Sequence, residues 1–217
     1  MLVNSNLVSH YIGKLRVYFL HIDVKRSLAA KTATRHIVFR GKCALSTSIA
    51  LGIIFPEIGN WTFELLQPPQ TDSWRSDAQK LGNYKVSYKE VNPVAGIQKS
   101  TSEIALVFSI TGRAVADVSD YFATNSIPIK RIISIEPENA PGNFSIQNDS
   151  EAVSLAGAAK NVIKQMINKY KATKVHLFYF GPAGLAIFLG QKLTSLGAIQ
   201  LYEFQDPGYK PSCLLKS

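Results

Sequence analysis

VHLFYFGPAGLAIFLGQKLTSLGAIQLYEF, residues 175–204, has the pattern of a strand, a turn, a helix and a second strand without interruption. Val175–Phe180 is short, apolar and rich in β-forming residues, which is typical of an interior strand of a parallel sheet. Gly181-Pro182-Ala183-Gly184 then leads into a helix, since proline is accepted in the first helical turn and glycine lets the backbone approach closely. The stretch predicts a βαβ unit of an open α/β fold.

The turn of this unit predicts an anion site. Backbone N–H groups at the start of a helix have no partner within the helix, and the positive end of the helix dipole lies there. In open α/β sheets such a turn lies beyond the carboxyl end of the strand, where ligands bind. We therefore expect Gly181, Pro182 and Ala183 to contact a phosphate. The alternative is a structural crossover turn that binds nothing.

The same pattern occurs in the middle of the chain. Ile104–Ile110 is an apolar strand, residues 114–125 form a short amphipathic helix, and Ile129–Ile135 is the return strand. The turn between the first two is Thr111-Gly112-Arg113. It offers a hydroxyl, a permissive backbone and a guanidinium that matches phosphate geometry. We expect these three residues to contact a ligand, although Arg113 in a plain surface cap is the alternative.

A third copy lies near the start of the chain. His36–Phe39 predicts a strand, residues 43–55 a helix and residues 61–66 the return strand, with Arg40-Gly41-Lys42 as the turn. The offset between the two strands is 24 or 25 residues in all three copies, so they share a period as well as a pattern. The backbone amides and cationic side chains of Arg40, Gly41 and Lys42 suit a phosphate. A solvated basic turn is the alternative.

Other segments extend this framework. Asn148-Asp149-Ser150-Glu151 is a capping box that predicts the start of a long helix. The β-rich stretches at residues 15–24 and 85–91 predict a sheet extension or an edge hairpin. Residues 67–83 have the composition of a long loop, and long loops are often functional.

Composition restricts the class of protein. Hydrophobic residues are 46% of the chain and charged residues 18%, and the formal net charge is +9, which suits an anionic partner. Lys and Arg form no consecutive block and do not alternate with aromatics as in a nucleic-acid groove, so a compact anion fits better than a polymer. Two cysteines and four dispersed histidines predict no disulfide framework and no metal site. No signal peptide or membrane span is indicated, so we expect a cytoplasmic protein.

Several segments of the chain together indicate a family. The chain resembles SAVED domains, which are sensors of cyclic oligonucleotides, over roughly residues 35–217. The specific part is the C-terminal block, and weaker landmarks precede it. The matching segments are residues 176–187, 190–191 and 199–204, then Phe39-Arg40-Gly41-Lys42, Leu45-Ser46, Ala50-Leu51-Gly52 and Trp74-Arg75-Ser76-Asp77.

The resemblance implies an α/β fold of two fused CARF-like (Rossmann-like) halves, with mainly parallel sheets flanked by helices. We place these halves at about residues 35–100 and 101–217. Residues 1–34 then form an N-terminal extension or effector-linker remnant with a strand, too short for an effector. In the family, a cyclic di- or trinucleotide binds between the halves and drives oligomerisation. That assembly activates a fused or associated antiphage effector such as a nuclease. No cofactor, membrane contact or direct nucleic-acid binding is expected.

Two further segments are candidate ligand contacts. Trp74 can stack on a base and Arg75 can hold a phosphate, and Tyr209 with Lys210 past the last strand is a weaker version of the same arrangement. The alternatives are a Trp74 packed on its own domain and a Tyr209 that anchors the C-terminal tail.

Sequence motifs of common hydrolases are missing, so we expect no catalytic residue. The rival function is an enzyme of the same fold, a nucleotide hydrolase or ring nuclease. It would use Arg113 or Glu136, since Glu136 and Glu138 after a strand form a carboxylate pair. Pro137 and Pro141 favour a solvated turn there. A sequence-independent nucleic-acid binder is a third option, and a steep salt dependence would be its sign.

Overall fold

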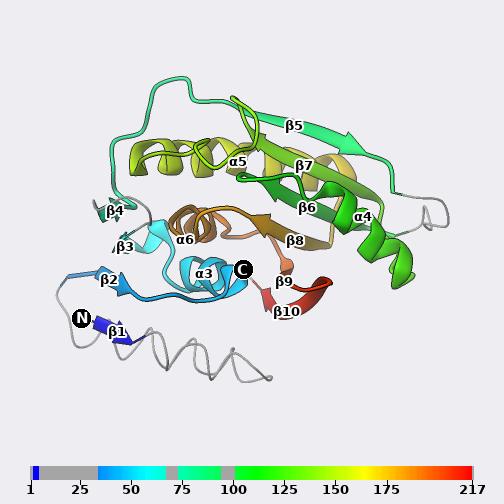
Figure 1. Ribbon diagram of the computed structural model, residues 1–217, viewed down its shortest axis with the longest axis horizontal. Coiled ribbons are helices and arrows are strands. Elements are labelled where there is room, and N and C mark those ends of the chain that lie inside the picture. Colours follow the sequence, from blue (N-terminus) through cyan, green and yellow to red (C-terminus); the bar gives the residue numbers. More distant parts are fainter. Residues whose placement is uncertain (1, 5–33, 67–72, 94–100, 217) are drawn as a thin grey trace.

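The computed structural model describes residues 2–4, 34–66, 73–93 and 101–216 (Figure 1). Within these residues the strands form a four-stranded sheet of order β1-β2-β3-β4 and a six-stranded sheet of order β10-β9-β8-β6-β7-β5. The strands are β1 (Leu2–Asn4), β2 (His36–Arg40), β3 (Thr62–Leu66), β4 (Ser73–Arg75), β5 (Val86–Val91), β6 (Glu103–Ser109), β7 (Arg131–Pro137), β8 (Lys174–Phe180), β9 (Ala198–Gln205) and β10 (Gly208–Lys216).

The helices of the described residues follow the predicted segments. The α-helices are α3 (Leu45–Ile54), α4 (Val115–Thr124), α5 (Asp149–Tyr170) and α6 (Ala183–Lys192), and a 3-10 turn that was not predicted, η1 (Glu57–Gly59), follows α3. Each predicted unit is confirmed as two parallel strands joined by a helix: β2-α3-β3, β6-α4-β7 and β8-α6-β9. The expected fold class, α/β with mainly parallel sheets flanked by helices, is confirmed.

The long helix α5 begins where the capping box predicts. The Asn148 side chain accepts a hydrogen bond from the Glu151 amide at 2.9 Å, and the Glu151 carboxylate accepts from the Gln147 amide at 2.8 Å. These bonds satisfy amides that the helix itself leaves unpaired. The box therefore fixes the start of α5.

The other expectations for local structure have mixed outcomes. Val86–Val91 form β5, an edge strand antiparallel to β7, which confirms the sheet extension predicted over residues 85–91. Because β5 pairs in the six-stranded sheet, the sheets divide the chain between β4 and β5, while the two-half boundary near residue 100 stays a prediction. Residues 73–75 form β4, so the loop predicted over residues 67–83 is wrong there. The strand predicted at residues 15–24 lies outside the described residues.

The helices sort onto the two faces of the six-stranded sheet. In Figure 1, α3 and α6 lie between the two sheets, α5 covers the same face of the larger sheet, and α4 lies on its opposite face. Successive side chains of β6 point to opposite faces of the sheet, so both faces carry apolar residues that a helix can cover. Ile104 and Leu106 point into the core shared with α3, α5 and α6, while Ala105 and Val107 point toward α4. Both faces of the sheet are therefore buried, as expected for parallel strands.

The two sheets are joined through a close crossing of α3 and α6. Gly52 and Gly190 meet backbone to backbone: a Cβ on Gly190 would lie 2.2 Å from the Ile49 carbonyl oxygen, and one on Gly52 would lie 2.1 Å from that of Ile187. Each glycine is the eighth residue of its ten-residue helix. The equivalent helices of two repeated units thus cross at equivalent positions.

Polar contacts reinforce this crossing beside the glycines. The Gln191 side chain of α6 donates to the carbonyls of Phe55 at 3.0 Å and Trp61 at 2.8 Å, at the end of α3 and before β3. The next residue, Lys192, is 4% exposed and pairs with Glu57 of η1. A buried charge is tolerated only with such a partner. These bonds fix the four-stranded sheet to α6.

We predict that Gly190→Ala lowers the free energy of unfolding by about 3 kcal/mol, because the new methyl group overlaps backbone atoms that cannot rotate away. Gly157→Ala is the matched control, since Gly157 lies in α5 and a Cβ added there would have no atom within 4 Å. That control should be neutral or stabilising by up to about 1 kcal/mol. Urea denaturation measures both, and equal effects of the two substitutions would contradict the crossing.

A buried polar network crosses three strands on the α4 face. His176 of β8 is 1% exposed, and its Nδ1 lies 2.7 Å from the Tyr202 hydroxyl while its Nε2 lies 2.6 Å from the Glu103 carboxylate. Burial lowers the pKa of His176 below its ordinary value, although the hydrogen bond to Glu103 opposes this. The ring is therefore neutral at pH 7, with Nε2–H donating to Glu103 and Tyr202 donating to Nδ1.

We predict that this network makes stability pH-dependent. The folded pKa of His176 is depressed, so below about pH 6.5 the unfolded chain binds a proton that the folded chain excludes, and stability falls as the pH drops. Above that value this histidine contributes no further change. His176→Gln keeps a hydrogen-bonding side chain without titrating there, so it should flatten the profile between about pH 6.5 and pH 5. Denaturation curves at stepped pH test this, and an unchanged slope in the variant would contradict it.

Candidate ligand-binding site

The larger sheet changes its winding direction between β6 and β8. From β6 the chain passes through α4 to β7 on one side, and from β8 it passes through α6 to β9 on the other, with the two helices on opposite faces. The crevice at the carboxyl ends of two such strands is where open α/β sheets bind ligands. The turns at residues 111–113 and 181–183 therefore flank the position that the topology favours for a ligand.

Backbone contacts hold these two turns together. The carbonyl oxygen of Phe180 accepts from the amides of Ile110 at 2.9 Å and Thr111 at 3.2 Å. The loop after β7 also reaches this point, because the Ile110 carbonyl accepts from the Gly142 amide at 3.0 Å and the Ser145 hydroxyl at 2.8 Å. The structure thus brings the two predicted turns side by side.

The glycines of these turns are required by close packing. A Cβ on Gly112 would lie 2.7 Å from Cε1 of the Phe180 ring, and one on Gly181 would lie 2.8 Å from the Ile110 Cβ. A larger residue at either position would push the turns apart. Beside Gly112, the side chain of Arg113 is exposed.

The first turn, Arg40-Gly41-Lys42, is placed differently. Arg40 and Lys42 are exposed, and Gly41 has φ 122°, a backbone conformation that favours glycine. However, α3 begins at the carboxyl end of β9, where the Glu203 carboxylate accepts from the Ser46 amide at 2.8 Å and the Leu45 amide at 3.4 Å. These two amides of α3 are therefore already bonded, while ligand contact by Arg40, Gly41 and Lys42 stays a prediction. The turn can still offer a ligand the exposed side chains of Arg40 and Lys42, and the Glu203 carboxylate lies at the helix start that follows them.

The expectation that Trp74 stacks on a base is wrong. Trp74 is 2% exposed and lies in β4 opposite Leu65, so it is part of the core between sheet and helices. Its neighbour Arg75 is exposed, but its guanidinium bonds the Asp77 carboxylate at 2.9 and 3.0 Å. Trp74 packed on its own domain is the interpretation that the structure supports.

Tyr209 is also buried rather than available to a ligand. It is 6% exposed and packs edge-on against Phe178 at 5.0 Å beneath α4. Burial raises the pKa of its hydroxyl to about 12. Tyr209 anchors β10 to the sheet, which was the alternative interpretation of this residue.

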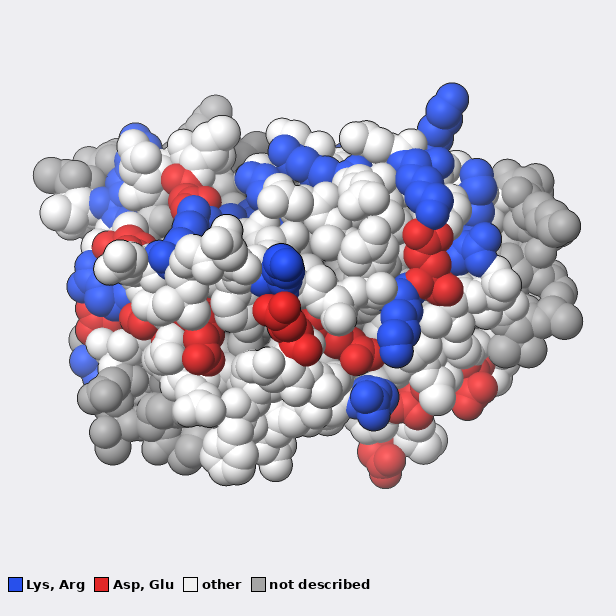
Figure 2. All heavy atoms as spheres, turned by 90° about the horizontal axis from the view of Figure 1, so that it is seen from above, with Lys and Arg blue, Asp and Glu red and all other residues white. Residues whose placement is uncertain are grey.

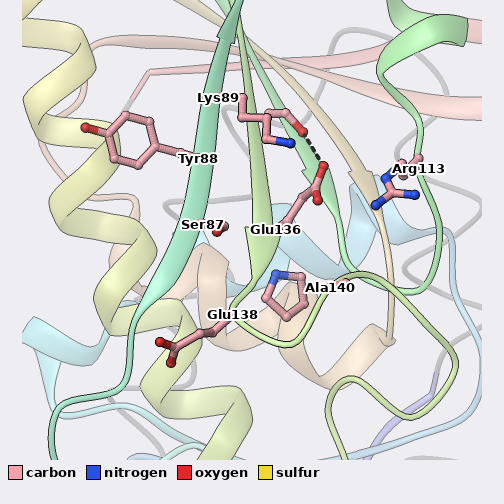
Figure 3. A pocket seen from close by; sticks show the side chains of 9 residues that line it. Ser87, Tyr88, Lys89, Arg113, Glu136, Glu138 and Ala140 are labelled. Atoms are coloured by element: carbon pink, nitrogen blue, oxygen red, sulfur yellow. Dashed lines mark hydrogen bonds between the residues drawn. The ribbon is translucent and has the colours of Figure 1, made fainter.

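A cavity of about 180 Å³ lies on the α4 side of the β5 edge (Figure 3). It brings Arg113 together with Glu136 and Glu138, the residues of the enzyme alternative, and adds Lys89 from β5. The Ser134 hydroxyl donates to the Glu136 carboxylate at 3.1 Å. Cations and carboxylates therefore share one hollow. The full lining is Ser87, Tyr88, Lys89, Arg113, Ser134, Glu136, Pro137, Glu138 and Ala140.

The charges that Figure 2 draws are mixed. On the face seen in Figure 2, which looks down on the molecule from above the view of Figure 1, Lys and Arg are interspersed with Asp and Glu and form no continuous basic stripe. Among the described residues, no group of three or more His, Cys, Asp or Glu side chains is placed to hold a metal ion. Within the same residues, no helix combines the length and the apolar character that crossing a membrane needs.

Phe180 and Glu203 also lie at the site, although no sequence motif predicted a role for them there. Phe180 is the last residue of β8 and 43% exposed, on the face that buries Phe178 two residues earlier. An apolar residue at the carboxyl end of a strand, directly before a glycine turn, was the available signal. Glu203 gave no local signal, because its contact with α3 joins residues 157 positions apart.

We predict that Glu203→Gln destabilises the protein by about 0.3–1 kcal/mol, because a neutral amide interacts less favourably with the positive end of α3. Asp120→Asn on the exposed face of α4 is the matched control and should have no effect. Thermal unfolding at low salt measures the difference, which should shrink at about 1 M salt as screening increases. A difference that salt leaves unchanged would contradict the electrostatic role of Glu203.

Comparison with known proteins adds independent observations. The family model described as "SAVED: SMODS-associated and fused to various effectors sensor domain" matches residues 20–215. A "CD-NTase-associated protein 4" of Enterobacter hormaechei subsp. hoffmannii is 34% identical over 116 residues, covering 51% of this chain and 23% of the relative. A protein of the same name from an Acinetobacter sp. is 28% identical over 182 residues, covering 83% and 37%. The chain thus spans well under half the length of these curated relatives.

Solved structures show the same fold. The Acinetobacter baumannii Cap4 SAVED/CARF-domain-containing receptor with the cyclic trinucleotide 3′3′3′-cAAA superposes with a TM-score of 0.74 at 21% identity, covering 99% of this chain and 45% of that one. The same receptor with 2′3′3′-cAAA gives a TM-score of 0.72 at 22% identity, covering 91% and 42%. These matches extend over both sheets.

Proposed function

The chain belongs to the SAVED family of sensor domains, and on that premise we propose that it binds a cyclic di- or trinucleotide. The observation that carries the proposal is the pair of turns at residues 111–113 and 181–183, bonded together at the winding change of the larger sheet. A fold like that of receptors solved with cyclic trinucleotides supports it. The proposed ligand contacts are Thr111, Gly112, Arg113, Gly181, Pro182 and Ala183, with Arg40, Gly41 and Lys42 from the other half.

The remaining functional steps lie partly outside this chain. The family name describes domains fused to various effectors, and the curated relatives are longer than the matched part. We infer that ligand binding promotes self-association, which activates a fused or associated antiphage effector, most simply a nuclease. In this role the chain regulates rather than catalyses, and it works in the cytoplasm where a nucleotide messenger is made.

We predict that calorimetry detects binding of 3′3′3′-cAAA or another cyclic di- or trinucleotide, and that Arg40→Ala and Arg113→Ala each weaken it about tenfold. A lost charge-assisted hydrogen bond of about 1.5 kcal/mol gives that factor. Lys164→Ala is the control, since this exposed residue lies 15 positions into α5, about 22 Å along the helix from its start.

The outcomes separate the hypotheses. If the Arg40→Ala and Arg113→Ala variants both bind the ligand as tightly as the wild type, the site assignment is refuted. If the wild type binds none of a panel of cyclic di-, tri- and tetranucleotides, the sensor function is refuted. Affinity that falls steeply with salt would instead favour a nucleic-acid binder, because many phosphate contacts release many counterions.

The cavity that joins Arg113, Glu136 and Glu138 favours a second candidate function, a ring nuclease. A carboxylate can act as a general base or acid, and a guanidinium can stabilise charge on phosphate. Chromatography of the incubated ligand distinguishes the two functions: a sensor returns it cyclic, whereas a nuclease releases a linear product and loses this activity in Glu136→Gln.

A further inference from the structure

The ring of Phe180 is an exposed apolar surface at the centre of the proposed site. It is 43% exposed, whereas Phe178, two residues earlier on the same face of β8, is fully buried and stacks on Tyr202 with ring centroids 4.2 Å apart. Phe204 at the end of β9 is 47% exposed, on the same face as Tyr202. The aromatic column therefore continues out of the core into solvent at the carboxyl edge of the sheet.

Phe180 is held in place rather than loosely exposed. Its carbonyl accepts two amides of the neighbouring turn, and its ring lies so close to Gly112 that no side chain fits between them. The backbone on both sides is thus fixed before any ligand arrives. A fixed aromatic ring loses little entropy on binding, which is the advantage of a preorganised site.

The surroundings of the ring indicate what covers it. Arg113 follows the glycine under the ring, and the turn at residues 181–183 follows Phe180 directly. A flat apolar face with a guanidinium and a helix start nearby suits a molecule that carries a ring and a phosphate together. A nucleotide has this combination, because its base stacks on an aromatic face while its phosphate accepts hydrogen bonds. An apolar protein partner would not need the cation.

We propose that a base of the cyclic nucleotide stacks on the exposed face of Phe180, with Phe204 at its border. This inference rests on the proposed function and deepens it, since it names the residue that recognises a base rather than a phosphate. It also replaces the stacking role that Trp74, buried in the core, does not provide.

The test compares calorimetric affinities for 3′3′3′-cAAA across variants of the full chain. Phe180→Ala should bind at least about tenfold more weakly, given the usual contribution of base–aromatic stacking. Phe180→Leu keeps apolar packing over Gly112 but lacks a ring, so it should weaken binding similarly while melting like the wild type. Phe180→Trp should bind like the wild type, and its added fluorescence should be quenched by the ligand. Ile58→Ala is the control, since Ile58 is 83% exposed in η1, which follows the opposite end of α3 from the turn at residues 40–42.

Each outcome has one meaning. Wild-type binding with Phe180→Ala and Phe180→Leu within about twofold overturns the stacking proposal and leaves the sensor function intact. If these variants keep the wild-type affinity but lose ligand-induced self-association, the stacking proposal is overturned in favour of a protein contact at Phe180. A wild-type chain that binds no cyclic nucleotide refutes both the stacking proposal and the proposed function.

Discussion

The arrangement of this molecule depends on the contact between Gly52 and Gly190. Because a Cβ on Gly190 would lie 2.2 Å from a backbone oxygen of α3, only glycine permits α3 and α6 to cross at this distance. The crossing lets Gln191 reach the Phe55 and Trp61 carbonyls and places buried Lys192 beside Glu57. It also brings the start of α3 to Glu203 at the carboxyl end of β9. Two sheets that share no strand thus become one body.

This geometry determines which groups remain available to a ligand. At the start of α3 an internal carboxylate already satisfies two amides, so the exposed side chains of Arg40 and Lys42, rather than a free helix end, are the groups we propose for an anion there. At the winding change between β6 and β8 the turns are bonded to each other through the Phe180 carbonyl. The turns at residues 111–113 and 181–183 are therefore held more firmly than the turn at residues 40–42. They present both the guanidinium of Arg113 and the ring of Phe180.

The sequence predicted most of the fold because the repeated units carry local signals. Apolar strands, glycine turns and helices recur at a constant period, and the capping box at Asn148 marks the start of α5. The burial of Trp74 was not predicted because β4 has only three residues, too few for a clear strand pattern. The alternation is nevertheless there, since Trp74 is buried between the exposed residues Ser73 and Arg75. Contacts such as Glu203 with Ser46 or Lys192 with Glu57 join distant parts of the chain, and no local pattern predicts them.

A crystal structure of the chain with a bound cyclic trinucleotide tests the account most directly. We expect one phosphate within hydrogen-bonding distance of the Arg113 guanidinium and one base parallel to the Phe180 ring, at the carboxyl ends of β6 and β8. A ligand held elsewhere, with the turns at residues 111–113 and 181–183 untouched, would contradict the account.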